Sequence, residues 1–243
     1  MSDLRYTLYY WPIPFRGIFI RALFALRELS YEDGSVQELI ELRRRPPEEQ
    51  PLPFMAPPLL HDHQRARWLS QFPVILRTLA EEHELLPTEP EARLIAEKVI
   101  LDSLDVLAEI TRSNGAQMWD RESWGRFRGE RLPRWLAIFE AIGGRHQLGE
   151  AEGTLLGGPL SVADLCCFAL WGTMERSFPS LSSTLRDNAP RVMALADRVA
   201  ARPQLQRFLE EERALLGERY CGGQIEASIR AMLEADALTS PSA

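Results

Sequence analysis

The chain has 243 residues, of which 45% are hydrophobic and 26% are charged, proportions typical of folded globular proteins rather than of disordered ones. Its formal net charge of -7 disfavours a nucleic acid or an acidic membrane as partner, because such polyanions are bound by basic patches. No stretch approaches the roughly 20 apolar residues of a membrane helix, and residues 1–5 lack a signal-peptide pattern. We therefore expect a soluble, cytoplasmic protein, long enough for two domains of moderate size.

The first predicted unit is βαβ. An aromatic and β-branched run over 6–11 predicts a strand, which ends at two closely spaced prolines. Apolar residues at near-helical spacing over 18–29 predict a helix, and 31–36 is suited to a second strand.

A β-hairpin and a helix are predicted to complete this domain. Residues 38–50 are polar, and the proline-dense passage 51–58 is incompatible with regular helix. Residues 59–61 and 66–69 then predict two antiparallel strands, and a helix over 73–82 opens on a proline, which suits a first helical turn.

The segment 86–90 is the predicted linker, because strand signals stop there and helical periodicity continues to the end of the chain. We expect domains over 1–84 and 91–243. Helices are predicted over 94–110, 132–142, 190–202 and 203–215. Ser161, with Asp164 three residues later, predicts a capping box at the start of one further helix.

In this order and at these separations, the elements resemble those of the cytosolic glutathione transferases over nearly the whole chain. The motifs that carry the resemblance are Tyr10-Trp11-Pro12-Ile13 followed by Ile20-Arg21, Ala56 to Leu60, Gln71 to Leu79, Leu160 to Asp164 and Pro190 to Pro203. Residues 132–135 resemble the sigma-related and proteobacterial branches. The resemblance implies an α/β thioredoxin-like amino-terminal domain, an all-α helical carboxy-terminal domain and a homodimer.

Tyr10 is the catalytic candidate. A tyrosine at the end of the first strand presents a phenol at the carboxyl edge of the sheet, where its hydroxyl can stabilise a thiolate. The resemblance assigns the thiolate to glutathione, and the spacing to Ile20-Arg21 favours Tyr10 over Tyr9, which should face the opposite side of the strand. A purely structural core aromatic is the alternative interpretation.

No protein thiol or metal is expected to take part. The cysteines, Cys166, Cys167 and Cys221, all lie outside the thioredoxin-like domain, which excludes the cysteine-type mechanisms of related enzymes. His61 and His63 flank a predicted polar turn with no further ligand cluster nearby, so we predict no metal site.

Several positions match the family's glutathione site, with departures. Pro58 matches the cis-proline that presents backbone groups to glutathione, or Pro57 does if the hairpin shifts by one residue. In the first register the preceding Pro57 has no N–H to donate. Gln71 matches the family's glutamine or glutamate, but Phe72 stands where a serine normally holds the γ-glutamyl carboxylate.

Positive charge and a second subunit are expected to complete the binding site. Arg16 and the run Arg43 to Arg45 could replace the missing contacts to a carboxylate, although the run also suits a solvated helix end. Asp105 resembles the residue that reaches across the family's dimer to the glutamyl amine, and a solvated helix acid is the alternative. Trp124, Phe127 and residues near Tyr220 are expected to line the pocket for the second substrate, or else to be core.

The resemblance, with Tyr10 at the matching position, implies a transferase of the detoxification type that activates glutathione with Tyr10 and adds it to a hydrophobic small molecule, or a peroxidase or isomerase that uses the same thiolate. Glutathione is a co-substrate, and no bound cofactor is expected. The competing hypothesis is a non-catalytic binding or interaction protein whose glutathione site has eroded at Pro57 and Phe72.

Overall fold

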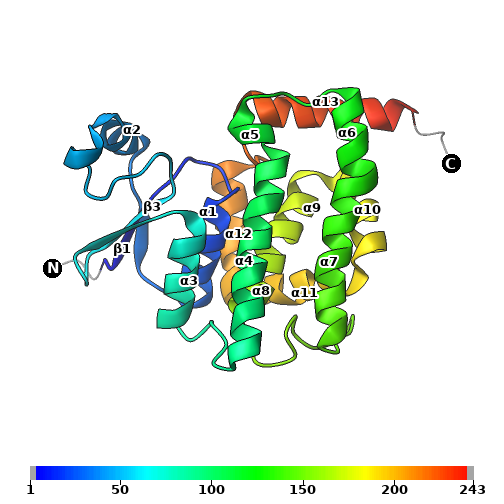
Figure 1. Ribbon diagram of the computed structural model, residues 1–243, viewed down its shortest axis with the longest axis horizontal. Helices are drawn as coiled ribbons and strands as arrows, with labels where there is room; N and C mark the ends of the chain where they lie inside the picture. Colours follow the sequence, from blue (N-terminus) through cyan, green and yellow to red (C-terminus); the bar gives the residue numbers. More distant parts are fainter. Residues whose placement is uncertain (1–3, 240–243) are drawn as a thin grey trace.

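The computed structural model describes residues 4–239. Residues 1–3, part of the amino-terminal segment whose sequence lacks a signal-peptide pattern, and residues 240–243 lie outside the described residues. Figure 1 shows the small sheet with α1, α2 and α3 at one end of the molecule and the longer helices at the other. No helix within residues 4–239 has both the length and the apolar composition needed to cross a membrane.

The βαβ unit is present as the sequence predicts. Strand β1 (Tyr6–Tyr9) leads into α1 (Gly17–Leu26), and β2 (Tyr31–Asp33) returns parallel to β1, with Tyr6 opposite Tyr31. The helix packs on the sheet through an almost continuous apolar surface, because nine of its ten residues are buried. The segment between β1 and α1 is therefore anchored at both ends.

The predicted hairpin adds two antiparallel strands beside β1. Strand β3 (Leu59–Asp62) pairs with β1, and β4 (Arg67–Ser70) pairs with β3, which gives the sheet order β2-β1-β3-β4. Helix α3 (Phe72–Glu82) follows directly. The end of β1 at Tyr9 therefore lies beside the start of β3 at Leu59, at the edge of the sheet where the candidate site is expected.

Helix α2 (Val36–Arg44) was not predicted within the polar segment 38–50. Its buried residues are Leu39 and Leu42 alone among its nine, so the apolar stripe is too narrow to produce a strong helical pattern. The Ser35 side chain accepts a hydrogen bond from the Glu38 N–H and caps the helix. A short 3₁₀ turn, η1 (Pro47–Glu49), follows it.

The two faces of the sheet have separate cores. Alternation along β1 directs Tyr6, Leu8 and Tyr10 into the large core that α1 and α3 share with the helical part of the chain. Tyr9 faces the opposite way, against Leu39 of α2, which confirms the predicted difference between the two adjacent tyrosines.

The remaining chain is helical, as the sequence predicts. Its elements are α4 (Pro90–Ile110), α5 (Arg112–Gly115), α6 (Arg121–Arg126), the π-helical turn η2 (Phe127–Arg131), α7 (Leu132–Arg145), α8 (Val162–Cys167), the π-helical turn η3 (Phe168–Gly172), α9 (Thr173–Ser177), η4 (Pro179–Leu181), α10 (Ser182–Asn188), α11 (Pro190–Ala200), α12 (Pro203–Leu216) and α13 (Gly223–Thr239). Helix α13 was not predicted, and it runs across one end of the other helices (Figure 1).

The capping box at Ser161 is confirmed and is entirely buried. The Asp164 carboxylate accepts hydrogen bonds from the Ser161 N–H at 2.7 Å and from the Leu155 N–H at 2.7 Å. Burial raises the pKa of Asp164, whereas these donors favour its ionised form. The motif therefore serves the structure of the helical part, as the sequence indicates.

Phe72 belongs to the core between α1 and α3. Its side chain is 1% exposed, and its ring centroid lies 4.8 Å from that of Phe19. The neighbouring Val74, in the same first turn of α3, is 50% exposed. The residue that departs from the family pattern thus contributes a large apolar side chain to the packing of the first domain.

We predict that Phe72→Ser lowers the free energy of unfolding by about 3–5 kcal/mol, the cost of deleting a buried aromatic side chain. Leu238→Ser, at an 88% exposed position on α13, is the exposed control and should change it by less than about 0.5 kcal/mol. Urea denaturation of both variants measures this difference. Equal, small effects would contradict the placement of Phe72 in the core.

Candidate functional site

Tyr10 lies immediately after β1 and is held by the start of α1. Its hydroxyl oxygen accepts a hydrogen bond from the Arg16 backbone N–H at 3.2 Å. Its ring lies against Gly17, where an added Cβ would come within 2.6 Å of the Tyr10 Cδ1 atom. Glycine at position 17 therefore lets the helix approach the ring closely enough for this hydrogen bond to form.

The Tyr10 hydroxyl is a neutral donor. Burial raises the pKa of Tyr10 to about 12, although the nearby Arg16 acts in the opposite direction. The hydroxyl therefore keeps its proton at neutral pH. Because its oxygen accepts from Arg16, the O–H proton remains available to a second acceptor, such as a thiolate.

A cavity of about 210 Å³ borders the Tyr10 ring between the sheet and α12. Its other lining residues are Pro12, Arg21, Tyr31, Asp33, Gly34, Val36, Phe208, Glu211, Glu212, Leu215 and Leu216. The Arg21 guanidinium binds the Asp33 carboxylate at 2.8 Å on one wall. Of the residues predicted for the glutathione site, Tyr10 alone lines this cavity.

Glu212 is a titratable group of this cavity that sequence reasoning missed. Burial raises its pKa to about 7, although Arg176 and Arg21 favour the charged form. Its Oε1 atom is buried and has no hydrogen-bond partner among the described residues. No local motif marks it, since its environment arises from α1, α9 and α12 meeting in space.

The cis peptide bond joins Pro57 to Pro58, directly before β3. Pro58 is thus the residue in cis, and the residue before it has no N–H, as the first of the two sequence registers implies. Both prolines are buried. Any backbone contact to a ligand at this point has to come from carbonyl oxygens or from residues other than these two.

Gln71 and Phe72 face different surroundings at the start of α3. Gln71 is exposed and has φ of 69°, an unusual backbone conformation for a non-glycine residue, which is often found at functional sites. The Phe72 ring lies in the core, so only its backbone N–H could reach a ligand here. The Pro73 that follows supplies no N–H.

Two arginines bring positive charge to the residues beside Tyr10. The Arg16 guanidinium lies 4.9 Å from the centroid of the Phe15 ring. The Arg43 guanidinium lies 5.7 Å from the centroid of Trp11, and its Nε donates to the Met55 carbonyl at 3.4 Å. Arg43 therefore connects α2 with the loop that leads to the cis-proline. Arg44 and Arg45 are exposed at the end of α2.

Asp105 is exposed on α4. It borders an open depression, which is lined by Asp105, Ala108, Glu109, Arg112, Ser113, Asn114, Gln117, Arg131 and Trp135. Within one copy of the chain, this depression contains none of the other residues predicted for the glutathione site.

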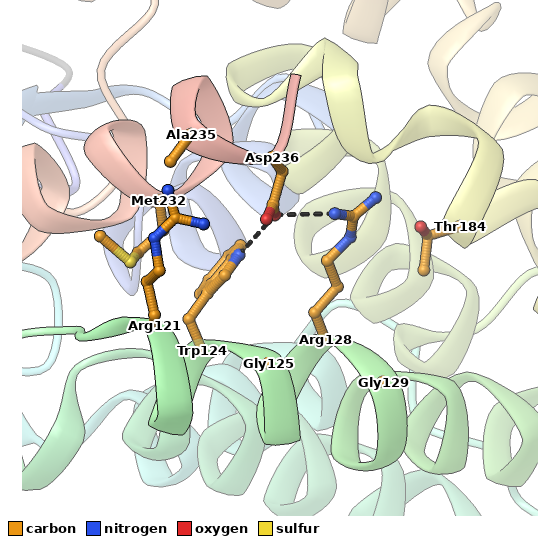
Figure 2. A pocket seen from close by; sticks show the side chains of 9 residues that line it. All are labelled: Arg121, Trp124, Gly125, Arg128, Gly129, Thr184, Met232, Ala235 and Asp236. Carbon is orange, nitrogen blue, oxygen red and sulfur yellow. Dashed lines mark hydrogen bonds and ion pairs between the residues drawn. The ribbon is translucent and has the colours of Figure 1, made fainter. Parts of the chain in front are cut away.

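Trp124 and Phe127, which were expected to line a pocket for the second substrate, are buried in the core. Trp124 is 4% exposed, contacts Trp119 and Phe127 through its ring, and donates from Nε1 to Asp236 at 2.9 Å. Figure 2 shows Asp236 between Trp124 and Arg128 at a cavity of about 390 Å³. Helix α13 thus covers this aromatic cluster.

The cysteines are poorly suited to nucleophilic chemistry. Cys166 and Cys167 are fully buried, and burial raises the pKa of each thiol. Burial also raises the pKa of Cys221 to about 12. Within residues 4–239, no group of three or more histidine, cysteine, aspartate or glutamate side chains is arranged to hold a metal ion.

Several solved structures have a fold similar to this one, among them a glutathione S-transferase. The pi-class glutathione S-transferase of Onchocerca volvulus superposes with a TM-score of 0.72 at 20% identity, covering 90% of this chain and 98% of that one. NaGST-2 gives 0.67 at 24% identity, covering 85% and 96%. The prostaglandin synthase D of Nilaparvata lugens gives 0.68 at 18% identity, covering 86% and 98%. These likenesses establish the fold.

Sequence comparison identifies the family. No curated protein sequence matches the chain. Residues 95–232, more than half of the chain, match the family description "Glutathione S-transferase, C-terminal domain". With its thioredoxin-like sheet and helical second part, the chain belongs to the cytosolic glutathione transferase superfamily.

Proposed function

We propose that the protein is a glutathione transferase in which the Tyr10 hydroxyl stabilises the thiolate of glutathione. The observation that carries this proposal is the hydrogen bond from the Arg16 N–H to the Tyr10 oxygen, which orients the hydroxyl and leaves its proton free. A hydrogen bond from that proton lowers the pKa of the glutathione thiol, whose ordinary value is about 8.5. The thiol proton passes to solvent, and the thiolate sulfur attacks an electrophilic carbon. The new C–S bond forms as the bond from that carbon to a leaving group breaks, and the leaving group departs with the bonding electron pair. Where the substrate is an activated double bond, the π bond opens instead and the adjacent carbon takes a proton from water.

Glutathione is proposed to bind along the edge formed by the end of β1, the cis-proline and the start of α3. Gln71 is exposed there, and the Phe72 N–H at the amino end of α3 can attract a carboxylate. Arg16 and Arg43 supply positive charge for the two carboxylates of the tripeptide. These contacts substitute for the hydroxyl and the N–H that Phe72 and Pro57 do not provide.

The second substrate is proposed to be a hydrophobic electrophile. The cavity beside the Tyr10 ring supports this class, because aromatic and aliphatic side chains such as Tyr31, Phe208 and Leu216 form much of its wall. A peroxidase or an isomerase that uses the same thiolate is included in the proposal, since both require the same activated sulfur. The sigma-like, tyrosine-type branch remains our interpretation of the Tyr10 motif.

We propose a homodimer of chains divided into domains at 1–84 and 91–243. Leu94 and Leu101, one heptad apart on α4, are 62% and 54% exposed, and Val74 on α3 is 50% exposed. A second copy of the chain would cover this apolar surface and bring its own Asp105 toward the partner's glutathione site. We also propose that the protein is located in the cytoplasm.

One alternative function has specific support. A non-catalytic binding protein would explain why Pro57 lacks an N–H and why the Phe72 side chain is buried in the core instead of facing a ligand. Calorimetric titration with glutathione separates the two functions. Measurable binding supports the transferase, whereas the absence of binding at millimolar glutathione would favour the binding protein.

We predict that Tyr10→Phe lowers the rate of glutathione conjugation to a model electrophile at least about tenfold at pH 6.5, because the thiol loses its hydrogen-bond donor. At pH 9 the loss should be smaller, since the thiol ionises without help. Tyr9→Phe is the matched control, because its hydroxyl bonds to Glu38 on the opposite face of the sheet. Equal losses at both pH values would argue against Tyr10 as the thiolate stabiliser.

A separate prediction concerns the oligomeric state. Leu101→Glu should shift the protein from dimer to monomer in light scattering, because a charge replaces an apolar side chain at the proposed interface. The exposed Leu215, on α12, provides the control Leu215→Glu. A wild-type protein that is monomeric at micromolar concentration would contradict the dimer.

A further inference from the structure

The turn that supplies the hydrogen bond to Tyr10 contains a strained residue. Phe15 has φ of 30°, and its side chain is only 3% exposed. A bulky residue in this backbone conformation is uncommon, and it persists only where surrounding contacts hold it. The next residue is Arg16, whose N–H bonds to the Tyr10 hydroxyl, so the conformation of Phe15 controls where that N–H points.

A distant segment, residues 219–222, packs against this turn. The Tyr220 ring lies edge-on to the Phe15 ring, with centroids 5.5 Å apart. Arg219 Nη1 donates to the carbonyl oxygen of Pro12, 207 residues away in sequence, at 3.3 Å. An added Cβ at Gly222 would lie 3.3 Å from the Ile13 Cγ2 atom, so the Gly222 backbone packs closely against the Ile13 side chain.

Glu226, near the start of α13, organises this segment. Its Oε2 atom accepts the N–H groups of Tyr220, Cys221 and Gly222 at 2.9, 3.0 and 2.6 Å. Its Oε1 atom accepts two hydrogen bonds from Arg230, at 2.7 and 3.0 Å. Although burial favours the neutral acid, these donors hold the pKa of Glu226 below its ordinary value. The side chain is thus an ionised carboxylate with five donors.

We propose that Glu226 and Tyr220 are positioning residues for thiolate activation. Glu226 fixes the backbone of residues 220–222, which places the Tyr220 ring against the Phe15 ring. That contact keeps the turn in the conformation in which the Arg16 N–H donates to the Tyr10 hydroxyl. The inference rests on the proposed function, because the effect is exerted on the thiolate that Tyr10 stabilises. Neither residue needs to touch glutathione for this role.

Loss of the contact between Tyr220 and Phe15 has a defined chemical consequence. Without the Tyr220 contact, Phe15 relaxes toward common backbone angles and the Arg16 N–H leaves the Tyr10 oxygen. The Tyr10 hydroxyl is then free to reorient and donates less well to the thiolate. The pKa of bound glutathione rises, so the loss of rate is largest below that pKa and small above it.

Glu226→Gln tests the proposal, with Glu140→Gln as the matched control. Glu140 also accepts backbone N–H groups and an arginine, those of Arg191 and Val192 at the start of α11, and its side chain is 12% exposed against 10% for Glu226. Neither Glu140 nor its partners belong to the Tyr10 turn. Both variants lose a buried carboxylate that holds a helix terminus, so a merely structural effect should be similar in both.

The measurement is the pH dependence of the thiolate absorbance of bound glutathione, together with the conjugation rate. We expect Glu226→Gln to raise the thiol pKa by about 0.5–1 unit and to lower the rate about three- to tenfold at pH 6.5, with little change at pH 9. Glu140→Gln should leave the thiol pKa at the wild-type value. Identical pH profiles for wild type and Glu226→Gln overturn the inference, even where Tyr10→Phe behaves as predicted.

Substitutions at Tyr220 keep the test decisive if Glu226→Gln does not fold. Tyr220→Ala should shift the pKa of the glutathione thiol in the same direction as Glu226→Gln. Tyr220→Phe should keep most of the rate that Tyr220→Ala loses, because its ring still reaches Phe15. The Tyr220 hydroxyl has no hydrogen-bond partner among the described residues, which is consistent with a role for the ring. Equal profiles for Tyr220→Ala and wild type also overturn the inference, and a wild-type protein without bound thiolate overturns the proposed function as well.

Discussion

The hydrogen bond between the Arg16 N–H and the Tyr10 hydroxyl connects the end of β1 with the beginning of α1, and the proposed chemistry depends on it. The bond orients a phenol that burial keeps neutral, with a pKa of about 12, so the group can donate a proton but cannot act as an anion at neutral pH. Close approach at Gly17 makes the bond sterically feasible. A larger residue there would separate the ring from the helix.

The same hydrogen bond lies in a turn that a carboxy-terminal segment, residues 219–222, contacts directly. The turn over 12–16 carries strain at Phe15, which local contacts alone would not be expected to maintain. Arg21 holds the turn from within the domain by donating to the Ile13 carbonyl at 3.1 Å. Tyr220 holds it from the helical part. The two parts of the chain therefore share contacts to this turn as well as one hydrophobic core.

Sequence patterns predicted the features that local chemistry determines. The βαβ unit, the hairpin and the Ser161 capping box each depend on neighbouring residues, and each is present. Helix α2 was missed because it buries too little apolar surface to show a helical period. The contact between Tyr220 and Phe15 could not be predicted, because no local pattern links residues so far apart in sequence. The burial of the Phe72 ring likewise depends on Phe19 from another helix.

The position of Phe72 bears on the choice between the two proposed functions, a transferase and a non-catalytic binding protein. Its ring stabilises the packing of α3 on α1. Phenylalanine at this position lacks the serine hydroxyl that normally binds the γ-glutamyl carboxylate in the family. Such a hydroxyl contributes about 0.5–1.5 kcal/mol, which corresponds to roughly a twofold to twelvefold change in affinity. A loss of that size weakens glutathione binding without touching the donor geometry at Tyr10. In the proposed transferase, the departures at Phe72 and Pro57 therefore bear on glutathione affinity, whereas the proposed thiolate chemistry depends on the Tyr10 turn and on the segment that contacts it.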